Sequence, residues 1–206
     1  MRIDYENKYD KIGRKELDQG NYDKAISYYT KSIEYNSENN IEADLPYYSR
    51  AIALKFLSRY EEANKDFRFS LSLYYKMLGA EADKNSPNSD RIRVGMIDAK
   101  TWISDIYLVN KSYEDVIIHC DDIIRLFGEI THIRFWMLPD QPIWDHYRVR
   151  SLAKLELHKY QEAVSDVGIA MTLCSDKEEV SKLKTLKVTI EMRERRSNFF
   201  MNSPTP

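Results

Sequence analysis

A short motif recurs four times along this chain of 206 residues: a Tyr, two polar residues, and then a small or branched apolar residue. The motifs begin at Tyr22, Tyr60, Tyr113 and Tyr160, and they end at Ala25, Ala63, Val116 and Ala163. Twelve positions before each end lies another small residue, in the order Gly13, Ala51, Ser104 and Ser151. Internal repetition constrains a fold more than local propensity does, because each repeat must stack on its neighbours to bury an apolar face.

The spacing within each repeat is that of two antiparallel helices. Apolar residues follow the end of the motif at four and eight positions, as Tyr29 and Ile33 do in the first repeat, so they share one helix face. The two small residues would lie where the helices cross, and would let the axes approach to about 8–10 Å. With only 6 Gly and 6 Pro, a sandwich or barrel of many short strands is disfavoured. The pattern therefore predicts an all-α chain of helical hairpins.

This pattern resembles the tetratricopeptide repeat, whose signature places aromatic residues, Gly and Ala at such positions. The repeats fall at about residues 6–39, 44–77, 97–130 and 144–177. The resemblance is clearest in the first two and weakest in the third, where Lys100, Val116 and Cys120 depart from the pattern. It implies a right-handed α-solenoid of antiparallel helix hairpins.

The spacing between repeats is irregular. Ala25 and Ala63 are 38 residues apart, Ala63 and Val116 are 53 apart, and Val116 and Ala163 are 47 apart, against about 34 in the family. The extra residues predict a loop centred on residues 84–90 and an insertion at 129–143. Residues 177–197 predict an amphipathic helix that caps the last apolar face, and 198–206 a flexible tail. We expect a single repeat domain over residues 1–200.

Composition narrows the function. The net charge of −2 shows no basic excess, so we expect no nucleic-acid partner. No stretch reaches the roughly 18 consecutive apolar residues of a membrane span, and the polar N-terminus is unlike a secretory signal. With only Cys120 and Cys174, a reducing, cytoplasmic location is expected. No phosphate loop, nucleophile elbow or zinc motif is present, so we predict neither an enzyme nor a cofactor or metal site.

In the tetratricopeptide family the first helix of each repeat lines a concave face. The corresponding positions predict a partner-binding groove with an apolar floor and charges of both signs. Its residues are Asp10, Arg14, Tyr48, Ile52, Lys55, Trp102, Asp105, Arg148 and Leu152. Aromatic and Arg side chains are the types that often dominate binding energy. Interior packing is the equally weighted alternative for Tyr48 and Trp102.

A second contact patch is predicted at the 129–143 insertion and the residue after it. It comprises Phe135, Trp136, Met137 and Trp144. So many large apolar side chains would not be left in water. The alternative is that this segment folds back over its own repeats.

The sequences of the first two repeats resemble those of co-chaperones that clamp the C-terminal carboxylate of heat-shock chaperones. The clamp itself does not carry over. Asp10 and Arg14 stand where it needs Lys and Asn, Ser49 replaces an Asn, and Asp98 and Trp102 replace Lys and Arg. An acidic tail would meet carboxylates instead of cations, so we predict that this chain does not bind one.

Together these observations predict an intracellular adaptor that binds a peptide or helix of a partner protein in the groove. The alternative is a structural subunit of a larger assembly, docked through the convex face and the 129–143 loop. A co-chaperone role is the least favoured of the three.

Overall fold

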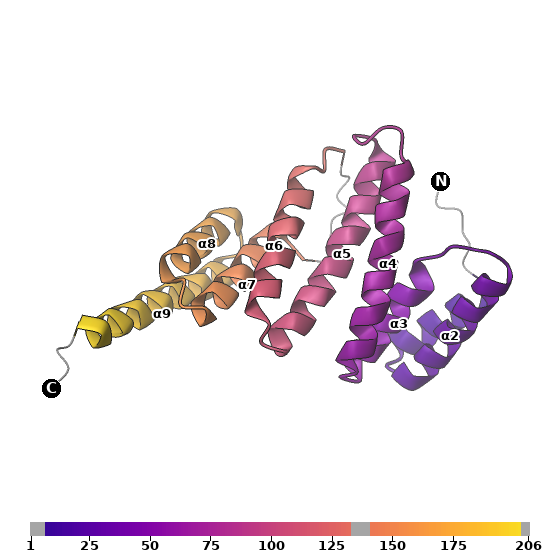
Figure 1. Ribbon diagram of the computed structural model, residues 1–206, viewed down its shortest axis with the longest axis horizontal. Helices are drawn as coiled ribbons and strands as arrows, with labels where there is room; N and C mark the ends of the chain where they lie inside the picture. The colour runs from indigo at the N-terminus through magenta and orange to yellow at the C-terminus, as the bar shows by residue number, and fades with distance from the viewer. Residues whose placement is uncertain (1–6, 133–140, 203–206) are drawn as a thin grey trace.

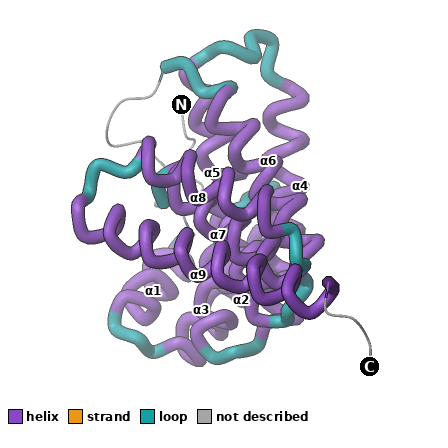
Figure 2. The backbone as a smooth tube through the Cα atoms, turned by 90° about the vertical axis from the view of Figure 1, so that its left-hand side faces the viewer, coloured by secondary structure: helices purple, strands orange, loops and turns teal. Residues whose placement is uncertain are grey.

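A computed structural model describes residues 7–132 and 141–202, and over these residues the chain is helical throughout, without a strand. The helices are α1 (Lys8–Asp18), α2 (Tyr22–Glu38), α3 (Leu45–Phe56), α4 (Tyr60–Ala80), α5 (Pro87–Val109), α6 (Tyr113–Gly128), α7 (Ile143–Glu156), α8 (Tyr160–Leu173) and α9 (Lys177–Asn202). They follow one another in a row from the N-terminal to the C-terminal end of the molecule (Figure 1). Seen from its end, the described part of the row consists of helices and the loops that join them (Figure 2).

Each Tyr of the sequence motif is the first residue of the second helix of a hairpin. Tyr22, Tyr60, Tyr113 and Tyr160 begin α2, α4, α6 and α8. We refer to α1, α3, α5 and α7 as the A helices and to their partners as the B helices. Each A helix packs on the B helix of its own hairpin, and each B helix packs on the A helix of the next one. The predicted all-α solenoid of helix hairpins is therefore confirmed.

The small residues lie at the helix crossings, as their spacing predicts. Ala51 and Ala63 of the second repeat are fully buried, and so are Ser151 and Ala163 of the fourth. In the first repeat, a Cβ atom on Gly13 would lie 3.0 Å from the ring of Tyr29. The close approach of the two helices therefore explains the glycine.

One turn geometry joins the helices of every hairpin. The residue two places before the motif Tyr has a positive φ, between 59° and 73°. These residues are Gly20, Ser58, Lys111 and His158. The following N–H donates to a carbonyl five residues earlier, for example Arg59 N to Leu54 O at 2.9 Å. This is the Schellman arrangement, which satisfies the last carbonyls of the A helix.

The 53-residue spacing between Ala63 and Val116 comes mostly from longer helices. Helix α4 has 21 residues and α5 has 23, and these two long helices lie in the middle of the row (Figure 1). The sequence predicts a loop centred on 84–90, but α5 begins at Pro87. Ser86 caps it by accepting a hydrogen bond from Ser89 N at 3.1 Å. At the other end, α9 continues to Asn202, so residues 198–202, predicted as tail, are helical.

An arginine bridge joins the helices in the second and fourth repeats. Arg50 of α3 donates to both carboxylate oxygens of Asp66 of α4, at 2.7 and 2.9 Å, and to Thr30 of α2 at 3.0 Å. Arg150 of α7 bonds in the same way to Asp166 of α8, at 2.9 and 2.5 Å. It also pairs with Asp121 of α6. Each arginine thus ties its own B helix to that of the preceding repeat.

The apolar core runs along the row. Its largest cluster joins α3, α4, α5 and α6 around buried Phe67, Ile97 and Ile103. A second cluster joins α7, α8 and α9 through Leu155, Val167 and Leu183. Among the described residues, no helix is both long enough and apolar enough to cross a membrane.

Candidate partner-binding surface

Five of the predicted groove residues come together between α3 and α5. The indole Nε1 of Trp102 donates to the hydroxyl of Tyr48 at 3.0 Å. The ammonium of Lys55 lies 4.0 Å from the centre of the Trp102 ring and 3.0 Å from a carboxylate oxygen of Asp105. Ile52, which lies on α3 with Tyr48 and Lys55, packs against the largest core cluster. We call Tyr48, Ile52, Lys55, Trp102 and Asp105 the α3–α5 cluster.

The aromatic members of the cluster rest on a buried ring. Phe67 of α4 meets Tyr48 edge to face, with ring centres 5.6 Å apart. It lies parallel to Trp102, with centres 6.3 Å apart and an angle of 5° between the planes. Because Phe67 is fully buried, it holds the rings of Tyr48 and Trp102 in place from the side of the core. Each ring packs inward and keeps some exposure. The role of Tyr48 and Trp102 as partner contacts stays a prediction.

The charged members of the cluster are only partly desolvated. The side chains of Lys55 and Asp105 are 20% and 30% exposed. A pair at that depth contributes little to stability, but its charges are available to new partners. The cluster therefore presents an aromatic floor, a cation and a carboxylate on two successive A helices.

Arg148 and Leu152 belong to α7, further along the row, and both are half-buried. Arg148 donates to Asp145 of its own helix at 2.6 Å. His146 lies between Asp145 and Arg148 in the sequence. Burial lowers the pKa of His146, although the carboxylates of Asp145 and Asp105 oppose that shift. Helices α5 and α7 approach each other, because Tyr107 and Leu108 of α5 pack against the cluster that contains Val149 and Ala153 of α7.

Asp10 and Arg14 of α1 behave differently from each other. Asp10 is only 2% exposed, and its carboxylate accepts a hydrogen bond from Asn7 N at 3.1 Å in a capping box. It was predicted as a groove contact, but it is buried as part of a helix cap, so we leave it out of the proposed contacts. Arg14 is exposed.

The predicted second patch is divided by the structure. Trp144 is partly buried and packs against the cluster of α7, α8 and α9. Trp144 belongs to α7 itself, so its packing does not decide between a contact patch and a segment folded back on its own repeats. Phe135, Trp136 and Met137 lie outside the described residues.

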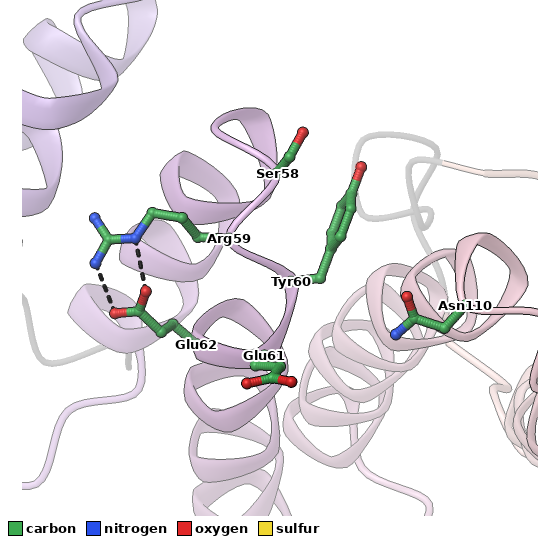
Figure 3. A pocket seen from close by; sticks show the side chains of 6 residues that line it. All are labelled: Ser58, Arg59, Tyr60, Glu61, Glu62 and Asn110. Atoms are coloured by element: carbon green, nitrogen blue, oxygen red, sulfur yellow. Dashed lines mark hydrogen bonds and ion pairs between the residues drawn. The ribbon is translucent and has the colours of Figure 1, made fainter.

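A shallow cavity of about 390 Å³ lies between the α3–α4 turn and the end of α5 (Figure 3). Its lining is polar and includes Arg59, Tyr60, Glu61 and Asn110. Arg59 is already engaged there, because it pairs with Glu62 at 2.6 Å, as the dashed lines in Figure 3 show. The cavity therefore lacks the apolar walls of a small-molecule site.

We next consider metal-binding and nucleophilic side chains elsewhere in the described residues. These residues contain no group of three or more His, Cys, Asp or Glu that could hold a metal ion. Burial raises the pKa of the Cys120 thiol to about 12, so this sulfur stays protonated at neutral pH. A buried thiol of that kind is a poor nucleophile and a poor metal ligand.

The fold and the A-helix surface define a class of protein: a solenoid of tetratricopeptide-like helical hairpins. A solved structure of this class, described as "putative kinesin light chain nearly identical TPR-like repeats" from Podosopora anserina, superimposes with a TM-score of 0.57. The likeness covers 90% of this chain and 94% of that one, at 12% sequence identity. At such low identity it shows the fold alone. No family model and no curated protein sequence matches the chain.

Proposed function

We propose that this protein is a protein-interaction scaffold that binds a peptide or helix of a partner protein on its A-helix face. The α3–α5 cluster carries the proposal. It combines a preorganised Trp–Tyr pair with a partly exposed cation and carboxylate. Large aromatic side chains held in place by a buried neighbour lose little entropy on binding, and they are typical hot spots.

The mixed charge of the cluster sets the kind of ligand it suits. Lys55 and Asp105 can each exchange their mutual contact for an opposite charge on the partner. Between them Trp102 offers a flat apolar face. The expected ligand is therefore a segment with one apolar side chain flanked by charges of both signs, rather than an acidic chain end. The predicted failure to bind chaperone tails remains part of this proposal.

The test is affinity capture of the tagged protein from its native cell extract, with partners identified by mass spectrometry and then retested as purified proteins. Trp102→Ala and Lys55→Ala are each expected to weaken binding about tenfold or more. Lys76→Ala is the matched control, because Lys76 also forms an ion pair, with Glu42 at 2.6 Å, but lies on a B helix. Melting curves must show that all variants remain folded.

If the partners bind Trp102→Ala and Lys55→Ala as tightly as the wild type, the A-helix surface is not the binding face. Loss of binding in Lys76→Ala alone would place the contact on the B helices. The alternative, a structural subunit docked through the convex face and the 129–143 loop, remains a prediction. Trp144, the part of its patch that the structure describes, is partly buried against the cluster of α7, α8 and α9.

A further inference from the structure

Helix α9 is covered on one side only. Leu183 and Ile190 are buried in the cluster with α7 and α8, at 1% and 0% exposure. On the opposite side Val188 is 52% exposed, Met192 57% and Phe199 70%. Polar contacts with the α7–α8 turn occur at Arg193, which pairs with Glu156, and at Glu194, which accepts from Gln161. Further on, the helix runs out past α7 and α8 (Figure 1).

The exposed side of α9 corresponds to a side that is buried in the A helices. In α3, Ala53 is buried in one cluster with Ala25 and Tyr29 of the preceding B helix, whereas Ala51, two residues earlier, lies at the crossing with α4. Two residues are a rotation of about 200° on a helix. Val188 and Met192 lie two residues to either side of Ile190, so they occupy the side on which an A helix packs against its own B helix. This side of α9 is thus a helix-packing face.

The spacing and charge of this face indicate what kind of helix would fit. Val188, Met192, Arg195 and Phe199 follow one another at intervals of four, three and four residues, the spacing of a coiled-coil seam. From residue 184 to 199, the helix carries five cations, Lys184, Lys187, Arg193, Arg195 and Arg196, against two carboxylates, Glu191 and Glu194, so this half of α9 has a net positive charge. A second copy of α9 would bring like charges together, which disfavours self-pairing.

We infer that α9 is a second docking site, distinct from the A-helix surface, that takes an acidic amphipathic helix of a partner protein. The partner's apolar stripe packs on Val188 and Met192, and a Glu or Asp in that stripe faces Arg195. An anionic membrane surface suits this face less well, because the apolar stripe is narrow and interrupted by Arg195, whereas membrane-lying helices present a broad apolar face.

The test uses a fluorescent synthetic peptide of about three heptads, with Leu at the seam positions, Glu on both flanks and one Glu within the seam. A twin peptide carries Lys in place of every Glu. Binding to the full chain is followed by fluorescence anisotropy at low and high salt. We expect the acidic peptide to bind, the basic twin to bind at least about tenfold more weakly, and salt to reduce the difference.

Two variants localise the binding. Val188→Glu is expected to weaken the acidic peptide about tenfold or more, and Arg195→Glu to reverse the preference towards the basic twin. Ile118→Glu on α6 is the matched control, because Ile118 is a similarly exposed branched side chain, at 59%. The Ile118→Glu variant should bind the acidic peptide within about twofold of the wild type. Trp102→Ala should also bind normally, which separates this site from the A-helix surface.

Three results would overturn the inference. The first is that the acidic and basic peptides bind equally tightly, or that neither peptide binds. The second is association of the full chain with vesicles containing phosphatidylserine that is lost in Val188→Glu, which would make α9 a membrane contact. The third is a dimer in analytical ultracentrifugation that Val188→Glu abolishes, which would make the occupant a second copy.

Discussion

The second and fourth repeats hold their hairpins together with an arginine bridge, whereas the third repeat uses different residues at the same positions. Where the second and fourth carry Arg50 and Arg150, the third carries buried Ile103. Where they carry Asp66 and Asp166, it carries His119. Its own ion pair lies one helical turn away, between Lys100 and Asp122 at 2.8 Å.

This difference shows which parts of the repeat the fold requires. All four repeats keep the crossing residues, the motif Tyr and the left-handed turn, although the side chains beside the crossing vary from a charged bridge to an apolar contact. Crossing and turn set the backbone geometry directly, because a larger crossing residue would force the helix axes apart. The neighbouring positions need only a pair of side chains that satisfy each other.

The largest effect should come from breaking what the repeats share. Ala63→Arg places a long charged side chain at a fully buried crossing. Overpacking and desolvation together should cost about 4 kcal/mol or prevent folding. Urea unfolding measures the loss, and Glu61→Arg, an exposed site on the same helix turn, serves as the control. A soluble Ala63→Arg variant with an unchanged melting temperature would contradict the assignment of the crossing.

The arginine bridge should have the next largest effect, and it should differ between the two repeats. Arg50→Ala leaves the carboxylate of Asp66, 8% exposed, without its bidentate partner, at a cost of about 2–3 kcal/mol. Arg150→Ala should cost less, because Lys154 stays 2.9 Å from Asp166. Arg59→Ala breaks an exposed pair and should leave stability unchanged. Equal losses for Arg50 and Arg150 would show that Lys154 does not compensate.

The third repeat should respond to pH through His119, as the fourth should through His146, whose pKa burial also lowers. Burial lowers the pKa of His119 to about 4, whereas the unfolded chain has a His pKa of about 6.5. Between these values the unfolded chain binds a proton that the folded chain does not, so stability is lost as pH falls through that window. We expect a loss of about 1–2 kcal/mol from pH 7 to 5, allowing for partial exposure of the ring.

His119→Leu should remove much of this pH dependence, which unfolding curves at pH 7 and 5 would show. The exposed His158, changed to Asn, provides the comparison. If both variants lose stability to the same extent on acidification, His119 is not the group responsible.

The smallest effects concern the turn that all repeats have in common. Ser58 and Lys111 adopt a φ of 60°, where the first repeat has Gly20 at 73°. Ser58→Gly and Lys111→Gly should each raise stability by about 0.5–1 kcal/mol, because glycine adopts this conformation without steric cost. Gly20→Ala should lower stability by a similar amount. Thermal melts can measure all three, and a loss of stability in the glycine variants would contradict the turn geometry.

The fold could be predicted from the sequence largely because the repeat places constraints of one kind at fixed intervals. The motif Tyr marks the first residue of each B helix, and the spacing of small residues places each crossing. The error at residues 84–90 has a physical cause. Ser and Pro indicate turns, but they also begin helices, and Ser86 and Pro87 are the N-cap and first residue of α5.

The candidate site could be predicted only in part. Tyr48 and Trp102 are 54 residues apart in sequence, and the repeat register alone placed them on neighbouring A helices. Asp10 fills the same register, but its carboxylate is near enough to the end of α1 to join a capping box, a local demand that repeat spacing does not express. The sequence predicts the amphipathic helix that becomes α9 but not its exposed apolar side, because which side the solenoid covers depends on how α9 packs against α8.

The row of hairpins has a further consequence for how the chain is made. Since each helix packs chiefly on its immediate neighbours in sequence, few contacts have to wait for distant residues. Chains rich in local contacts fold quickly, and repeats can nucleate at any hairpin and extend from it. Each hairpin can therefore dock on the preceding one soon after it leaves the ribosome.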